Sequence, residues 1–154
     1  MAPRPSATDR PDIGREERPT IPTDLGERFA YAIAAQDAVA LKALLAPDVI
    51  FRALTPGKSW ESEGADAVVD DVILGKWFPP ERSITAILRV DRGAVGAVGH
   101  VAYRFRARRP DGDFIIEQQA YLETDDDRIC WLQILCSGFV PTPAVSGSPA
   151  RTGS

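Results

Sequence analysis

Much of the second half of the chain alternates apolar and polar side chains, and this alternation constrains the fold more than any other feature. Residues 98–108 read VGHVAYRFRAR, which puts Val101, Tyr103 and Phe105 on one side of an extended strand. Turn-forming sequences, DRG, RPDGD and DDD, interrupt the alternation. The pattern predicts an antiparallel meander of four strands. The expected strands are 83–90, 94–108, 114–124 and 128–138.

The first half predicts three helices and one strand. The sequence DLGE at 24–27 is typical of a helix start, and the first helix is expected over 24–35. Asp37 can cap a second short helix, which Pro47 ends. A strand DVIFRAL, a loop TPGKSWESEG and a third helix in ADAVVDDVILGKWF follow. Helices that precede a run of strands, without regular alternation, indicate an α+β fold with a curved, mostly antiparallel sheet.

Composition divides the chain into one domain and two tails. Residues 1–21 combine repeated proline with charge, and residues 141–154 are mainly Pro, Ser, Gly and Ala, so both are expected to be disordered. The folded domain is then 22–140. A net charge of -4 argues against nucleic acid as a partner, because phosphate contacts need an excess of Lys and Arg. Neither a membrane span nor the apolar core of a signal peptide is visible, so we expect a cytoplasmic protein.

The cysteines give no indication of a disulfide or a metal site. Cys130 and Cys136 lie on one expected strand, about 20 Å apart at ~3.3 Å per residue, which is too far for a disulfide. With a single histidine, the chain also has too few ligands for a zinc site. No GxxxxGK, GxSxG or GxGxxG sequence occurs. We therefore expect neither a metal nor a cofactor.

The order of the elements carries a resemblance to a known family. Two helices, the PDVIF strand, a third helix and the long meander, with the phrases APDVIFRAL and GHVAYRFR, resemble the NTF2-like, or SnoaL-like, superfamily. The resemblance implies a cone in which a curved sheet and about three N-terminal helices enclose an apolar cavity. Its members include polyketide cyclases, steroid isomerases, limonene-type epoxide hydrolases and non-enzymatic modules. The fold alone therefore leaves the function open.

The single histidine, His100, falls on the polar side of its strand, and Glu117 falls on the polar side of the next. An imidazole with a pKa near neutrality can transfer protons, and Glu117 could orient it or act as a base. We therefore take His100 and Glu117 as the candidate catalytic residues. Glu117 could equally be the ion-pair partner of a neighbouring arginine. The polar side is either the lining of the cavity or a solvated surface.

The strand register decides which polar side chains meet on this side. If the RPDGD turn places Arg106 opposite Glu117, and Arg104 opposite Gln119, one sheet face collects most of the polar candidates. Arg52 could hold a substrate carboxylate, and aromatic side chains could surround an apolar ligand, although aromatic residues at these positions equally suit a packed core. The candidates for substrate binding are Tyr31, Arg52, Trp60, Trp77, Arg104, Gln119 and Tyr121.

These residues and the resemblance predict a cofactor-independent cyclase or isomerase that acts on a polyketide-like or terpenoid-like small molecule in the cavity. A hydrolase or dehydratase in the same pocket is one alternative. A non-catalytic binding or association module is another. Because family members often pair through the sheet, a homodimer is expected, with Tyr103, Phe105 and Trp131 as the apolar surface.

Overall fold

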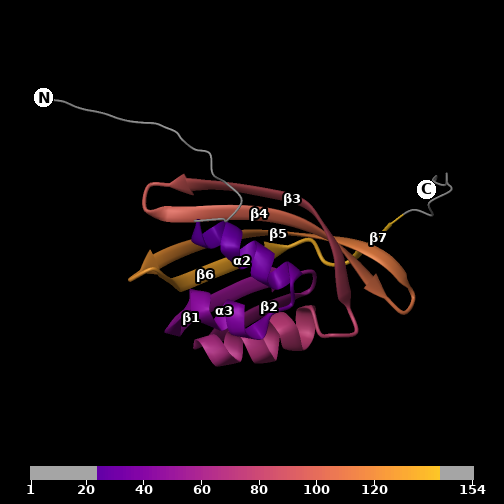
Figure 1. Ribbon diagram of the computed structural model, residues 1–154, viewed down its shortest axis with the longest axis horizontal. Helices are drawn as coiled ribbons and strands as arrows, with labels where there is room; N and C mark the ends of the chain where they lie inside the picture. The colour runs from indigo at the N-terminus through magenta and orange to yellow at the C-terminus, as the bar shows by residue number, and fades with distance from the viewer. Residues whose placement is uncertain (1–23, 143–154) are drawn as a thin grey trace, which may run out of the picture.

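The computed structural model describes residues 24–142, in which a layer of helices covers one face of a single curved sheet (Figure 1). Most of the expected tails, 1–21 and 141–154, lies outside the described residues. Pro141 and Thr142 are the exceptions: Pro141 belongs to a short strand that pairs with the sheet, and the main-chain N–H of Thr142 donates to the carbonyl of Asp113. The folded part therefore extends slightly beyond residue 140.

The first two helices begin where the sequence predicts. In α2 (Leu25–Ala34) the Asp24 carboxylate accepts the N–H of Glu27 at 3.0 Å. In α3 (Ala38–Leu44) the Asp37 carboxylate accepts the N–H of Ala40 at 3.1 Å. Side-chain caps of this kind satisfy amides that have no partner inside the helix. α3 ends before Pro47, because the chain is already extended from Leu45.

The third helix, η2 (Ala67–Trp77), is a π-helix, whereas the sequence predicted an ordinary one. Its last bond runs from the N–H of Phe78 to the carbonyl of Ile73, five residues earlier, at 2.8 Å. Val68 and Trp77 are both buried. Nine residues make about two and a half turns of an α-helix, which would place these two side chains on opposite sides. The wider helix brings both to the core.

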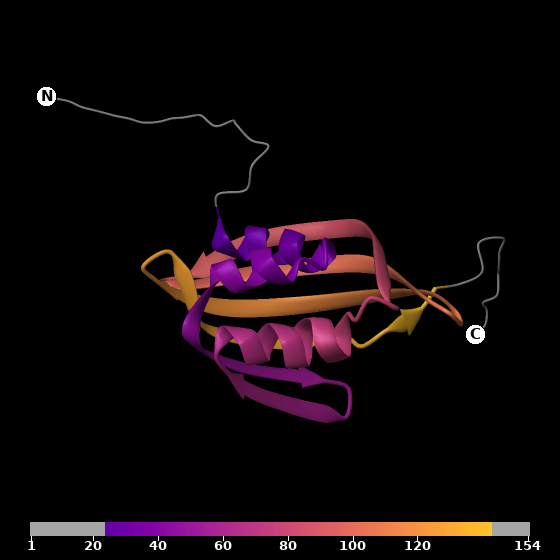
Figure 2. The same ribbon diagram turned by 60° about the horizontal axis from the view of Figure 1, so that its bottom comes forward.

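The sheet has seven strands in the order β2-β1-β6-β5-β4-β3, with β7 paired to β5 (Figure 2). β1 and β6 run parallel, and the other pairs are antiparallel, which confirms the expected α+β class. The strands are β1 (Leu45–Thr55), β2 (Lys58–Glu63), β3 (Ser83–Val95), β4 (Val98–Arg109), β5 (Gly112–Asp125), β6 (Arg128–Cys136) and β7 (Val140–Pro141).

Two turns differ from the prediction. The expected loop TPGKSWESEG contains strand β2, because a tight turn at Pro56 and Gly57, where Gly57 has a φ of 76°, folds the chain back onto β1. Trp60 therefore lies on a strand. The DRG sequence does not turn: β3 continues through Gly93, and the chain reverses at Gly96, whose φ is 58°.

The register of β4 and β5 also differs, by two residues. Arg104, and not Arg106, is opposite Glu117, while Arg106 is opposite Ile115 and Gln119 is opposite Ala102. A shift of two residues leaves every side chain on its original side of the sheet, so the predicted faces are correct although the predicted pairs are wrong.

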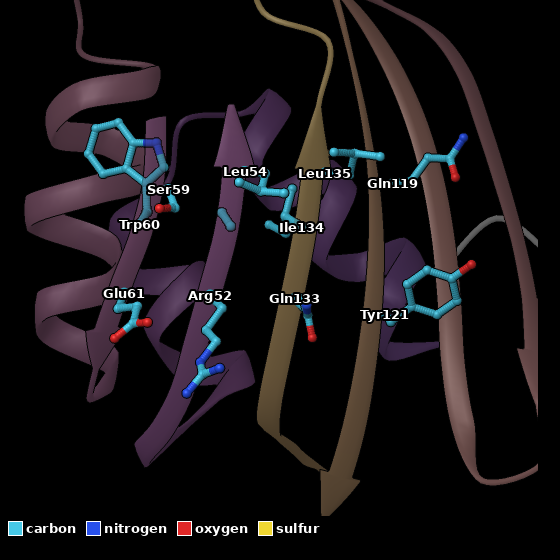
Figure 3. Close-up of a pocket in the computed structure, with 11 residues that line it drawn as sticks. Arg52, Leu54, Ser59, Trp60, Glu61, Gln119, Tyr121, Gln133, Ile134 and Leu135 are labelled. Atoms are coloured by element: carbon cyan, nitrogen blue, oxygen red, sulfur yellow. The ribbon is translucent and has the colours of Figure 1, made fainter. Parts of the chain in front are cut away.

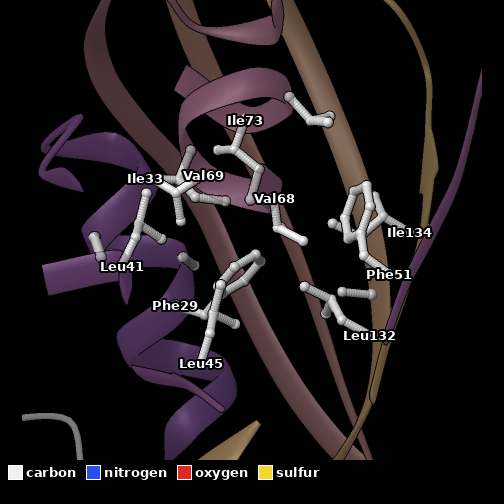
Figure 4. Close-up of a cluster of buried hydrophobic side chains, with 14 of the residues drawn as sticks. Phe29, Ile33, Leu41, Leu45, Phe51, Val68, Val69, Ile73, Leu132 and Ile134 are labelled. Carbon is white, nitrogen blue, oxygen red and sulfur yellow. The ribbon is translucent and has the colours of Figure 1, made fainter. Parts of the chain in front are cut away.

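The core lies between the helices and the side of the sheet that faces them (Figure 4). Phe29 and Ile33 from α2 and Val69 and Ile73 from η2 are fully buried there. Tyr103 and Phe105 belong to the same core, at 1% and 0% exposure, so they cannot form the expected surface between two copies. Phe51 and Leu132 complete this side on β1 and β6.

One side chain ties the helices to the segment that leads into β3. Gln36, in the turn after α2, adopts a left-handed backbone with a φ of 51°. Its amide nitrogen donates to the carbonyls of Phe78, Pro79 and Arg82 at 3.1, 3.3 and 3.2 Å. Its amide oxygen accepts the N–H of Ile84 at 3.1 Å. Four main-chain groups are thus satisfied by a single residue.

Candidate functional site

The sheet has two faces, and the residues selected from the sequence divide between them. We call the side against the helices the inner face and the other side the open face. Side chains alternate between the two along each strand. The open face carries the exposed or partly exposed residues Arg52, His100, Arg104, Arg106, Glu117, Gln119 and Tyr121.

The three aromatic candidates on or near the helices occupy different environments. Trp77 is buried, with its ring 5.7 Å from Phe51 and 5.9 Å from Trp60 between centroids. Trp60 is partly buried at the edge of the sheet, and its indole N–H donates to the Thr55 hydroxyl at 2.8 Å. Tyr31 lies on the outer side of α2 and is 44% exposed. Trp60 and Trp77 meet, and Tyr31 is separate from both.

A row of polar side chains crosses the open face from strand to strand. Glu61 on β2 is opposite Arg52 on β1, and Arg52 is opposite Gln133 on β6. Gln133 is opposite Tyr121 on β5, and Tyr121 is opposite His100 on β4. Neighbouring strands are about 4.8 Å apart, so the row links side chains whose positions in the sequence are far apart.

A groove of about 350 Å³ lies along part of this row. Figure 3 shows its side chains, which come from β1, β2, β5 and β6. Four of the seven predicted binding residues line it: Arg52, Trp60, Gln119 and Tyr121. Leu54 and Leu135, which are opposite each other on β1 and β6, supply apolar surface with 54% and 60% exposure. The groove therefore combines charged, amide and aliphatic groups.

His100 packs beside this groove and not inside the cone. Its ring stacks against Tyr121, with centroids 4.8 Å apart and planes tilted by 40°. Its Nε2 atom is buried and has no hydrogen-bond partner among the described residues. His100 also lines a second hollow of about 240 Å³, together with Asp24, Leu25 and Gly26 at the start of α2.

Glu117 pairs with an arginine and does not orient His100. Its Oε1 atom accepts from Arg104, at 2.7 Å from Nη2 and 2.8 Å from Nε. His100 lies four residues from Arg104 on the same strand, about 13 Å away at ~3.3 Å per residue. The structure thus brings Arg104 and Glu117 together, and it separates the two residues selected as catalytic.

The inner face contains a polar pair that the sequence reasoning missed. The Tyr103 hydroxyl donates to Oε1 of Gln118 at 2.6 Å. Gln118 Nε2 and Trp77 Nε1 are buried and have no hydrogen-bond partner among the described residues. A signal was present, because Gln118 occupies an inward position between Ile116 and Ala120. A polar residue inside an otherwise apolar stripe must find a partner or bind something.

Burial also perturbs two groups on this face. The pKa of Tyr103 is raised well above 10.0, because the desolvated phenolate is disfavoured and the nearby Cys136 adds a smaller effect. Burial likewise raises the pKa of the Cys136 thiol, against smaller opposing effects of the nearby Gln118 amide and of the Gly138 main chain. Both groups are therefore uncharged at neutral pH.

Residues 24–142 contain no group of three or more His, Cys, Asp or Glu side chains suited to hold a metal ion. Over the same residues, no helix is both long enough and apolar enough to span a membrane. Cys130 and Cys136 are both free thiols.

Neither a protein-family model nor a curated protein sequence matches the chain. Solved structures do resemble it. An LEH-like epoxide hydrolase from M. tuberculosis is 18% identical with a TM-score of 0.55, over 73% of this chain and 80% of that one. A proposed polyketide cyclase from Xanthomonas campestris is 15% identical with a TM-score of 0.57, over 72% and 86%.

An NTF2-like protein from Burkholderia thailandensis E264 is 17% identical with a TM-score of 0.57, over 73% of this chain and 88% of that one. Identities this low carry a fold and not an activity. The three helices, the curved sheet and these three likenesses agree with the resemblance seen in the sequence. The chain has the NTF2-like cone fold.

Proposed function

We propose that the chain binds an apolar, carbonyl-bearing small molecule against the inner face and acts on it as a cofactor-independent cyclase. The observation that carries this proposal is the unpartnered amide nitrogen of Gln118, a residue that is only 1% exposed. A buried donor without an acceptor costs free energy, about 1–3 kcal/mol, and a ligand carbonyl is one acceptor that removes the cost.

The neighbouring groups suit such a ligand. Tyr103 donates to the amide oxygen of Gln118, which leaves the amide nitrogen as the donor available to a ligand. Aromatic side chains surround this pair, with Phe29 6.3 Å and Phe105 5.1 Å from the Tyr103 ring between centroids. An apolar ligand would therefore contact hydrocarbon around one fixed polar group, which is the usual composition of small-molecule sites.

Ring closure is the chemistry that needs least from these side chains. In an intramolecular aldol closure, an α carbon loses a proton and attacks a carbonyl carbon of the same molecule, and the carbonyl oxygen gains the proton. No co-reactant is consumed. The protein contributes by holding a folded substrate conformer and by donating to the oxygen on which negative charge develops.

A binding module without catalysis is the second candidate, and one observation favours it. Among the described residues, Gln118 is the buried residue of polar or charged type, so the inner face offers no carboxylate or imidazole as a base. Both isomerisation and an aldol closure move a proton from an α carbon, so without such a base the protein contributes only the substrate conformer and the donor at Gln118, and the proton must leave to water. The same inner face equally suits a carrier that only binds.

The test uses 1-tetralone, an apolar ketone, beside tetralin, which has the same rings without the carbonyl. Binding is followed by NMR, and the carbonyl stretch of bound tetralone is measured by infrared spectroscopy. We expect tetralone to bind more tightly than tetralin, with its stretch shifted to lower frequency. The variant Gln118→Leu should remove both effects, and the open-face control Arg106→Leu should keep them.

Catalysis is tested separately with nonane-2,8-dione, a linear diketone that can close a ring, by following its conversion by NMR. Binding of tetralone together with ring closure supports the cyclase. If tetralone binds but nonane-2,8-dione is not converted, the result supports the binding module. If tetralone binds no better than tetralin, or Gln118→Leu binds it unchanged, the inner-face proposal is wrong.

A further inference from the structure

We propose that the groove on the open face is a second ligand site, and that it takes an apolar α-amino acid. The site is formed by Arg52 and Glu61, which carry charge, and by Leu54 and Leu135, which supply apolar surface. It lies on the side of the sheet opposite to Gln118, so it is independent of the function proposed above.

The first observation is the state of Arg52. Over residues 24–142, no carboxylate lies within ion-pair distance of its guanidinium, although Glu61 is directly opposite on β2. The arginines of β3 and β4 behave differently, because most of them pair with a carboxylate: Arg89 with Asp91, Arg92 with Asp24 and Glu27, Arg104 with Glu117, Arg108 with Asp113, and Arg109 with Asp111.

Two opposite charges on neighbouring strands, both exposed and not bonded to each other, form a complement for a zwitterion. A guanidinium offers several N–H donors in a plane, which suits a carboxylate. The Glu61 carboxylate accepts from an ammonium group. An α-amino acid carries both groups on one carbon, so it can contact Arg52 and Glu61 together. Figure 3 shows these two side chains on neighbouring strands.

The apolar part of the groove fixes the class of side chain. Leu54 lies two residues from Arg52 on the same face, about 7 Å away at ~3.3 Å per residue. Leu135 is directly opposite Leu54, and both are more than half exposed. An aliphatic or aromatic side chain attached to the zwitterion reaches this pair and removes it from water.

The test titrates the full-length protein with L-leucine and follows binding by NMR and calorimetry. Two analogues each lack one charge: 4-methylpentanoate has no ammonium group and 3-methylbutylamine has no carboxylate. The variants are Arg52→Gln and Glu61→Gln, and the matched control is Arg106→Gln, another open-face arginine that lies outside the groove. Light scattering gives the mass of the protein at each stage.

We expect saturable leucine binding. Arg52→Gln and Glu61→Gln should each weaken it roughly tenfold, which corresponds to about 1.4 kcal/mol of binding free energy. Arg106→Gln should leave the affinity unchanged. Each analogue should bind more weakly than leucine. If 4-methylpentanoate bound as tightly as leucine, the proposal that the site recognises both charges of an amino acid would be wrong. Absence of leucine binding at millimolar concentration would overturn the site, and so would a dimer that covers the groove, recognised by a doubled mass that Leu135→Asp halves.

Discussion

Tyr103 and Gln118 are opposite each other on β4 and β5, and the phenol hydroxyl of one donates to the amide oxygen of the other over 2.6 Å. Both side chains are 1% exposed. The pair is therefore a neutral hydrogen bond inside an apolar layer, and each member leaves the other unsatisfied if it is removed.

This dependence predicts the stabilities of three variants. Tyr103→Phe leaves the Gln118 amide without any partner, and Gln118→Leu leaves the Tyr103 hydroxyl without one, so each should lower the free energy of unfolding by about 1–3 kcal/mol. The double variant removes both polar groups and should be more stable than either single variant. Urea unfolding of all four proteins measures this. Additive losses in the double variant would contradict the coupling.

The same residue predicts a loss of stability at alkaline pH. Burial raises the folded-state pKa of Tyr103 above its ordinary value near 10.0, so its contribution is complete below that value and is lost as the pH rises toward the folded pKa. The raised pKa of Cys136 acts in the same direction from its ordinary value near 9.0. We expect the free energy of unfolding to fall from pH 9 upward. In Tyr103→Phe the fall should be smaller, and an unchanged slope would count against this origin.

Glu117→Gln should have a small effect. Its ion pair with Arg104 is on the open face, where the two side chains are 29% and 43% exposed, and such pairs contribute less than about 1 kcal/mol. Tetralone binding at the inner face should not change. The measurement is urea unfolding together with the tetralone titration. A large loss of tetralone binding would return Glu117 to the catalytic role that the sequence suggested.

Gly75→Ala should destabilise η2. A Cβ at this position would lie 2.2 Å from the carbonyl oxygen of Asp70, so the main chain of the helix must move. We expect this strain to lower the free energy of unfolding by about 1–3 kcal/mol. The matched control is Gly93→Ala, where no atom lies within 4 Å of the added methyl group. Thermal unfolding of both variants should show a lower midpoint only for Gly75→Ala. Equal midpoints would mean that η2 adapts without cost.

The predictions from sequence succeeded where one local rule decides the outcome. Asp24 and Asp37 cap their helices, because a carboxylate near exposed amides is sufficient. Strict alternation on β4 and β5 assigned each side chain to its correct face. The α+β class and the superfamily resemblance followed from the order of such elements. Neither required knowing which residues are opposite each other on neighbouring strands.

The predictions failed where two distant segments had to be aligned. The register that pairs Arg104 with Glu117 depends on the length of a turn, and the alternation is the same for a shift of two residues. Glu61 and Arg52 occupy opposite positions on paired strands because of the unrecognised strand β2, whose polar residues resemble a loop. The catalytic role of His100 stays a prediction, and the unpartnered Gln118 amide becomes visible only when burial is known.

The amide of Gln36 has a consequence for how the molecule opens. It bonds the turn after α2 to the main chain at Phe78, Pro79, Arg82 and Ile84, so the helices and the start of β3 share one set of bonds. Segments joined in this way exchange their amide hydrogens together. The helical layer should therefore not lift from the sheet as a separate unit, and the amide of Ile84 should exchange with solvent only when the whole domain unfolds.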